Sequence, residues 1–139
     1  MSVPVYRRSE NKLDAYVKTK EMVKYTMHMI ENEKLFPKKS RWNLASRISD
    51  NCLDSITKVR QANKIQPKTV GQAKFRLKLQ FDVLLHFEAL WSLLTVAYET
   101  YSFPSEKIDI WCKLLLVAEE KVSAWRRYDM KRFSEEFTL

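Results

Sequence analysis

The side chains that could support nucleophilic, acid–base or metal chemistry are few and far apart in the 139-residue sequence. They are Cys52, Cys112, His28 and His86. Glu88 follows His86 by two residues, which places the two side chains on different faces of a helix, whereas di-iron bundles use Glu and His three residues apart. A single glycine, Gly71, excludes a glycine-rich phosphate loop. The sequence therefore predicts no catalytic residue, no metal site and no cofactor.

Positive charge is concentrated in one window of the chain. Lys and Arg number 25 against 17 Asp and Glu, and the window from Ser55 to Phe81 holds seven basic residues and no acid. These residues are Lys58, Arg60, Lys64, Lys68, Lys74, Arg76 and Lys78. Clustered cations suit phosphate binding, because each neutralised phosphate releases a counterion. We predict that they contact nucleic acid; a solvated basic face without a ligand is the alternative interpretation.

Two smaller basic groups accompany this window. The stretch LFPKKSRWNLASRI, residues 35–48, contributes Lys38, Lys39 and Arg41 as a second set of candidate phosphate contacts. A weaker cluster near the C-terminus consists of Arg126, Arg127, Lys131 and Arg132. No base-reading motif accompanies any of these groups, so binding is predicted to depend on charge or shape. The preference between RNA and DNA stays open.

The elements that must position these side chains are predicted to be four helices. Glycine and proline are scarce, with one and four residues, which favours long helices and short connections. Apolar spacing predicts helices over 11–32, from Ser40 to Asn63, from Thr69 to Tyr101 and from Pro104 or Ser105 onward. We expect an all-α, antiparallel up-and-down four-helix bundle over residues 11–133. Residues 1–10 are expected to form an N-terminal arm and residues 134–139 a C-terminal tail.

Composition also bears on compartment and on the apolar segments. The N-terminal sequence lacks the continuous apolar region of a secretory signal, and we interpret both cysteines as core residues of a reducing cytoplasm. The stretch 77–101 has the length of a membrane span. Four polar side chains interrupt it, Asp82, His86, Glu88 and Glu99. Burying these in lipid is costly, so we expect a cytoplasmic protein in which this helix is buried on more than one face.

Aromatic residues are more numerous than a small bundle needs, with four tryptophans and six tyrosines. Trp111 and Trp125 lie on the seam of the last helix, where steps of three and four residues continue without a break. Core packing is the first interpretation of this seam. Leftover apolar surface would pack against a neighbouring subunit, so we also expect Trp111 and Trp125 at a homo-oligomer interface.

The corner between the first two helices resembles that of the Avd-like family of four-helix bundle proteins. The matching residues, in order, are Phe36, Pro37, Lys38, Arg41, Leu44, Arg47 and Ile48. The later stretch WCKLLLVAEEKVSAWRR is similar to the family's final helix, and the likeness covers Leu13 to Arg127. Related bundle proteins encoded within ribosomal RNA genes usually carry an Asn-Ile-Ala-Glu-Gly run in the second helix, which this chain lacks. Ala45 stands near a position where Avd proteins often have glycine.

The resemblance implies an accessory factor of a diversity-generating retroelement. Such a protein is expected to be a basic homopentamer that binds the retroelement reverse transcriptase and its template RNA or cDNA, and that supports mutagenic cDNA synthesis without catalysing it. No binding residue is carried over from the family. The alternative hypothesis is an oligomeric protein–protein scaffold, without nucleic-acid binding, whose seam residues dock a partner helix.

Overall fold

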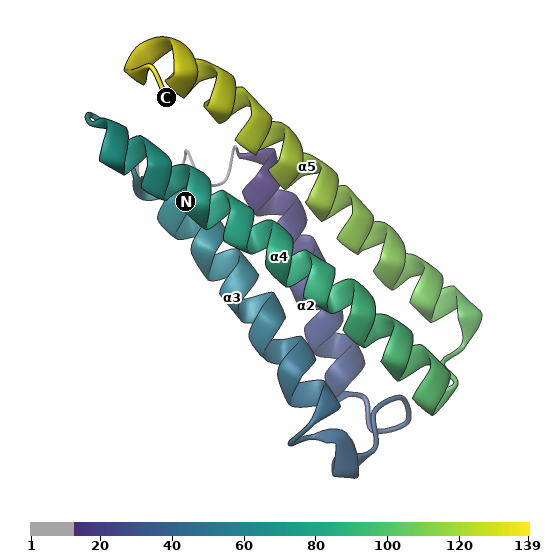
Figure 1. Cartoon of the computed structure of the whole chain (residues 1–139). Coiled ribbons are helices and arrows are strands. Elements are labelled where there is room, and N and C mark those ends of the chain that lie inside the picture. The colour runs from purple at the N-terminus through teal and green to yellow at the C-terminus, as the bar shows by residue number, and fades with distance from the viewer. Residues whose placement is uncertain (1–12) are drawn as a thin grey trace, which may run out of the picture.

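The computed structural model describes residues 13–139, so the expected N-terminal arm, residues 1–10, lies outside the described residues. The elements are α2 (Asp14–Glu31), the short 3-10 helix η1 (Lys38–Ser40), α3 (Leu44–Lys64), α4 (Val70–Tyr101) and α5 (Ser105–Phe137) (Figure 1). Consecutive long helices run antiparallel, and α5 packs back onto α2 as well as onto α4, which closes the bundle. The predicted all-α, antiparallel four-helix bundle is confirmed.

The start of α3 differs from the prediction. Ser40 ends η1 instead of capping α3, and its hydroxyl donates to the Pro37 carbonyl at 2.8 Å. Asn43 is the N-cap, and its side-chain oxygen accepts from the Leu44 N–H. A single 3-10 turn therefore stands between the proline and α3. At the start of α4, Thr69 is the N-cap, and its hydroxyl accepts from the Gln72 N–H at 3.2 Å.

Trp111 lies in the second turn of α5, near the α4–α5 connection, and is fully buried within the single chain. Its indole Nε1–H donates to the Thr26 hydroxyl at 2.9 Å, and its ring stacks with Phe103 at a centroid distance of 6.3 Å. The prediction that Trp111 belongs to an oligomer interface is therefore wrong, since a side chain enclosed by its own chain cannot reach a neighbour. Trp125 is half-buried, and the Arg76 guanidinium lies 5.3 Å from its ring centroid.

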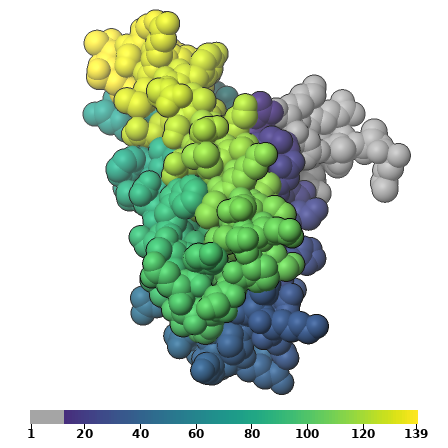
Figure 2. Space-filling view, turned by 90° about the vertical axis from the view of Figure 1, so that its right-hand side faces the viewer, coloured from purple at the N-terminus to yellow at the C-terminus, as the bar shows by residue number. Residues whose placement is uncertain are grey.

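The helices differ in length, and this difference creates an extended end of the bundle. α2 has 18 residues, whereas α4 has 32 and α5 has 33. At a rise of about 1.5 Å per residue, α4 is roughly 20 Å longer than α2. The first turns of α4 and the last turns of α5 therefore extend beyond the start of α2 (Figures 1 and 2). We call this region, residues 58–82 and 126–137, the long end.

A small apolar cluster of its own holds the long end together. Ala73 and Leu77 of α4 pack with Phe133 of α5, and Phe137 lies against Phe133 with the ring centroids 5.9 Å apart. α5 thus continues to Phe137, four residues beyond the expected end of the bundle at residue 133. The expected tail of residues 134–139 is reduced to Thr138 and Leu139.

A buried ion pair lies beside this cluster. Arg76 Nε donates to Asp129 Oδ2 at 2.8 Å, and the two side chains are 6% and 1% exposed. Gln80 donates to the same oxygen at 2.7 Å, and Arg132 donates to Oδ1 at 3.1 Å. Arg76 also donates to the Ile65 carbonyl at 2.9 Å. The prediction that Arg76 contacts nucleic acid is wrong, because its guanidinium is committed to this network.

The outer face of α4 carries both apolar and polar side chains. By length and composition alone, α4 could cross a membrane, and 28% of its most apolar 18-residue stretch is buried. Leu85 and Val96, on the side away from the core, are each 50% exposed. The helix is therefore buried on the sides that face its neighbours, as expected. Its outer surface is mixed, because Glu88, Ser92 and Glu99 are exposed on the same side as Leu85 and Val96.

Removing the Asp129 carboxylate should destabilise the bundle strongly. Asp129→Ala leaves the Arg76 guanidinium buried without its charge partner, which costs about 3–5 kcal/mol. The free energy of unfolding, measured by urea titration with circular dichroism, should fall by that amount. As a matched control, Asp82→Ala removes the exposed pair with Lys78, 3.1 Å apart, and should cost less than about 1 kcal/mol. Equal losses in the two variants would contradict a structural role for Asp129.

Candidate nucleic-acid interface

Most of the surplus positive charge of the chain resides at the long end. Residues 58–82 and 126–137 together carry eleven Lys or Arg side chains and four Asp or Glu, while the other residues carry fourteen basic and thirteen acidic side chains. The two stretches meet in space, because Arg126 Nε of α5 donates to the Leu77 carbonyl of α4 at 3.2 Å. A positive field at one end of an elongated molecule favours an encounter with a polyanion at that end.

Most of the predicted phosphate contacts reach the surface there. Exposed residues are Arg60, Lys64, Lys68, Lys74 and Lys78, whereas Lys58 is half-buried and Arg76 is buried. Arg60 and Lys64 lie one turn apart on α3, and Lys74 and Lys78 lie one turn apart on α4. Lys78 keeps 70% of its side chain exposed although its ammonium lies 3.1 Å from Asp82. The structure thus brings five of the seven residues to the outside of one end.

Lys58 is held in place by a histidine of the neighbouring helix. Its ammonium lies 2.9 Å from His86 Nε2, and His86 Nδ1 lies 2.9 Å from Asn51 Oδ1. An ammonium can only donate, so Nε2 accepts and Nδ1 carries the proton that is given to Asn51. Burial, followed by the Lys58 charge, lowers the pKa of His86, while Asp54 and Asp82 act in the opposite direction. His86 is therefore a neutral tether for Lys58.

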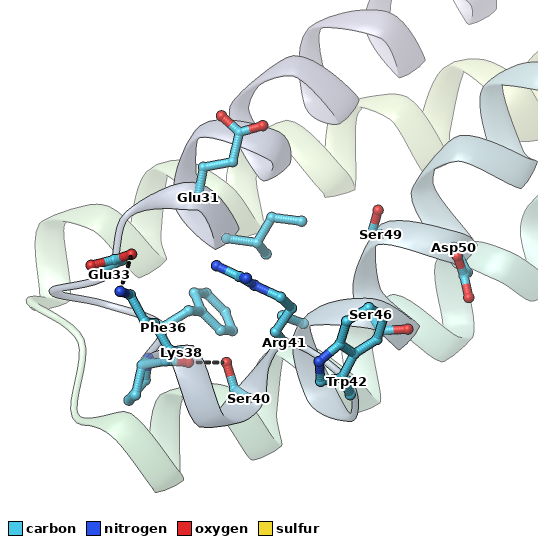
Figure 3. A pocket seen from close by; sticks show the side chains of 13 residues that line it. Glu31, Glu33, Phe36, Lys38, Ser40, Arg41, Trp42, Ser46, Ser49 and Asp50 are labelled. Atoms are coloured by element: carbon cyan, nitrogen blue, oxygen red, sulfur yellow. Dashed lines mark hydrogen bonds and ion pairs between the residues drawn. The ribbon is translucent and has the colours of Figure 1, made fainter.

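The second predicted group lies at the other end of the bundle. Lys38, Lys39 and Arg41 precede α3, whose 21 residues separate them from Lys64 by roughly 30 Å. Lys38 and Arg41 line a hollow of about 410 Å³ between α2, η1 and α3, and the Arg41 side chain extends toward α2 (Figure 3). The structure does not bring this group together with the residues of the long end.

Acidic side chains offset the charge of that hollow. Its lining includes Glu31, Glu33 and Asp50, and the carboxylate of Glu33 lies 3.8 Å from the Lys38 ammonium (Figure 3). Trp42 also lines it and is 88% exposed. This corner therefore has a mixed charge, which suits a polyanion less well than the long end.

Exposed aromatic side chains at the long end were missed by sequence reasoning. Phe75 is 55% exposed, Phe81 46% and Tyr128 66%. The guanidinium of Arg126 lies 5.2 Å from the Phe81 ring centroid, and that of Arg132 lies 5.8 Å from the Tyr128 ring centroid. Phe75 lies between Lys74 and Arg76 in the sequence, and this position could have indicated an exposed aromatic residue. Because α4 has apolar residues on several sides, the sequence did not show which side faces solvent.

The described cysteine, histidine and acidic side chains show neither a metal-ligand grouping nor a thiol with a lowered pKa. Among residues 13–139, no three His, Cys, Asp or Glu side chains are grouped as metal ligands would be. Burial raises the pKa of Cys52 to about 12, so its thiol stays protonated at neutral pH. Cys112 is half-buried, and burial together with the charge of Asp109 raises the pKa of its thiol as well.

Comparisons with known proteins were made for the whole chain. No protein-family model matches the sequence, and no curated protein matches it.

The tether between Lys58 and His86 predicts a low histidine pKa. In an NMR pH titration, His86 should titrate below 6.5, and Lys58→Met should raise that pKa without restoring the ordinary value, because burial remains. Since the folded-state pKa is lowered, this residue favours folding above about pH 6.5, and the contribution is lost as pH falls from there through the folded-state pKa. A His86 pKa at or above 6.5, or one unchanged in Lys58→Met, would contradict this arrangement.

Proposed function

We propose that the protein is a non-catalytic nucleic-acid-binding protein and that the long end is its phosphate-binding surface. The supporting observation is the placement of charge: eleven basic residues against four acidic ones at this end, with the rest of the chain close to neutral. Exposed lysines on adjacent helices can each neutralise a phosphate, which gives affinity without sequence selectivity. Lys64, Lys74 and Lys78 are the proposed principal contacts.

The resemblance of the corner residues extends this proposal to a cytoplasmic accessory factor of a diversity-generating retroelement. In that role the protein would associate with the reverse transcriptase and hold template RNA or cDNA during mutagenic synthesis. The matching residues Phe36 and Pro37 have a structural part here: Phe36 packs on Phe103 at a centroid distance of 5.0 Å, and Pro37 ends the connection that follows α2. These two residues thus have packing and chain-direction roles in this bundle, and the proposed family role rests on the sequence resemblance alone.

Self-association is part of the same proposal, and the resemblance implies a homopentamer. With Trp111 enclosed in the core, the surface that favours a second copy is the outer face of α4 around Leu85 and Val96. Leu85 and Val96 lie three turns apart on one face of α4, and Glu88 and Ser92 are exposed between them, so the proposed contact with a second copy combines apolar and polar side chains.

A scaffold without nucleic-acid binding is the second candidate, and the exposed Leu85 and Val96 side chains of α4 favour it. The absorbance ratio at 260 and 280 nm of the purified protein separates the two candidates. Copurifying nucleic acid supports the first, and clean protein that retains a partner band supports the second.

Charge reversal at the long end should weaken nucleic-acid binding and its salt dependence together. In the triple variant Lys64→Glu, Lys74→Glu and Lys78→Glu, the slope of log affinity against log salt should fall in magnitude by about 2, since each lost contact with a single strand removes about 0.7. Fluorescence anisotropy with a labelled single-stranded RNA at several salt concentrations gives both quantities.

The matched control for charge reversal is at the opposite end of the bundle. This control is the triple variant Lys38→Glu, Lys39→Glu and Arg41→Glu. It changes the net charge by the same amount, but it alters a corner that already contains acidic residues. This control should keep most of the affinity and of the salt slope. Equal losses in the two triple variants would show that only net charge matters and would contradict a localised surface.

Glutamates on the outer face of α4 should dissociate the proposed oligomer. Leu85→Glu with Val96→Glu places two like charges at the contact, so the mass from light scattering should fall to that of one chain. Leu53→Glu is the control, because Leu53 is 46% exposed on α3 and lies outside this face. A wild-type protein that is already monomeric at micromolar concentration would contradict the proposed self-association.

A further inference from the structure

Phe75 stands between two shallow hollows where α3 and α4 meet at the long end. One hollow, of about 440 Å³, is lined by Arg60, Gln61, Lys64, Ile65, Phe75 and Leu79. The other, of about 470 Å³, is lined by Lys64, Ile65, Gln66, Gly71, Gln72 and Phe75. Phe75, Lys64 and Ile65 line both, so the aromatic ring forms part of a wall shared by two open spaces. A flat ligand can approach the ring from either of them.

Phe75 takes no part in the packing of the two apolar clusters of the bundle. More than half of the residue, 55%, is exposed, and it belongs to neither apolar cluster of the described residues. The neighbouring residues on α4, Ala73 and Leu77, are buried and hold this part of the helix against α5. The ring is thus presented outward by a backbone that is fixed from the other side.

Positive charge flanks the ring. Lys74 precedes it, and Lys78 lies one turn further along the same helix, both exposed. Lys64 lines both hollows from α3. The two hollows contribute no carboxylate, because their remaining lining residues are apolar, amide or glycine. An aromatic face beside ammonium groups combines the two features that recognise a base and its phosphate.

This combination distinguishes single strands from duplexes. Bases in a duplex are stacked on one another and hide their faces, whereas an unpaired base can leave the strand and lie on an aromatic ring. A duplex could use the lysines but not Phe75. Binding that uses the Phe75 ring therefore selects single-stranded nucleic acid over a duplex.

We propose that the long end binds single-stranded nucleic acid, with one base stacked on Phe75 and the adjacent phosphates neutralised by Lys74 and Lys78. This inference rests on the proposed nucleic-acid-binding function and specifies its substrate form. Stacking on a phenyl ring is tolerant of sequence, so the site accepts RNA or DNA with little base preference.

The test compares a labelled single strand of about 20 nucleotides, long enough to span several contacts, with a duplex of the same sequence. Wild type should bind the single strand more tightly. Phe75→Leu keeps an apolar side chain of similar volume but removes the ring, and it should weaken single-strand binding about 10-fold, with the salt slope and the duplex affinity unchanged. Phe75→Trp should retain single-strand binding.

Trp42→Leu is the matched control, because Trp42 is an exposed aromatic residue beside basic residues at the opposite end. It should leave both affinities unchanged. Circular dichroism should show equal helicity in all variants, since Phe75 is outside the core. Unchanged single-strand affinity in Phe75→Leu, or an equal loss for the duplex, would overturn the stacking site.

The two proposals fail in different ways. If Lys74→Glu with Lys78→Glu weakens binding while Phe75→Leu does not, the stacking site is overturned and the phosphate-binding surface stands. If wild type binds neither the single strand nor the duplex at low salt, both are overturned.

Discussion

The ion pair between Arg76 and Asp129 fixes the end of the bundle on which the proposed interface depends. α2 begins at Asp14 and does not reach the first turns of α4, so four-helix packing cannot hold them. The pair joins α4 to α5 instead, and its further bond to the Ile65 carbonyl anchors the connection from α3. Because a helix turns about 100° per residue, Arg76 held inward places Lys74 and Lys78 outward. The buried cation thus sets the orientation of the exposed ones.

The two ends of the molecule have different electrostatic character. At the long end, lysines on α3 and α4 surround an aromatic ring, and the carboxylates of Asp82 and Asp129 are paired with basic side chains. Glu135 and Glu136 are exposed near the end of α5. At the opposite corner, lysine and arginine share a hollow with three carboxylates. The proposed polyanion-binding surface therefore lies at one end of the molecule, whereas the charges of the opposite corner compensate one another.

The sequence allowed the bundle to be predicted because apolar spacing and scarce glycine depend only on neighbouring residues. It did not show that Arg76 is buried, because Asp129, its ion-pair partner, lies 53 residues further along the chain. Trp111 was misassigned for a similar reason, since its hydroxyl partner, Thr26, is on the first described helix. Phe75 was missed because α4 is apolar on several sides, and only the placement of α3 and α5 decides which side remains exposed.

The central claim is that nucleic acid binds at the long end. The most direct measurement is the change in backbone amide NMR shifts when single-stranded RNA is added to the full chain. The account predicts shifts confined to residues 58–82 and 126–133, with those of Lys74, Phe75 and Lys78 among the largest. Shifts centred on residues 38–42, or spread evenly over both ends, would contradict it.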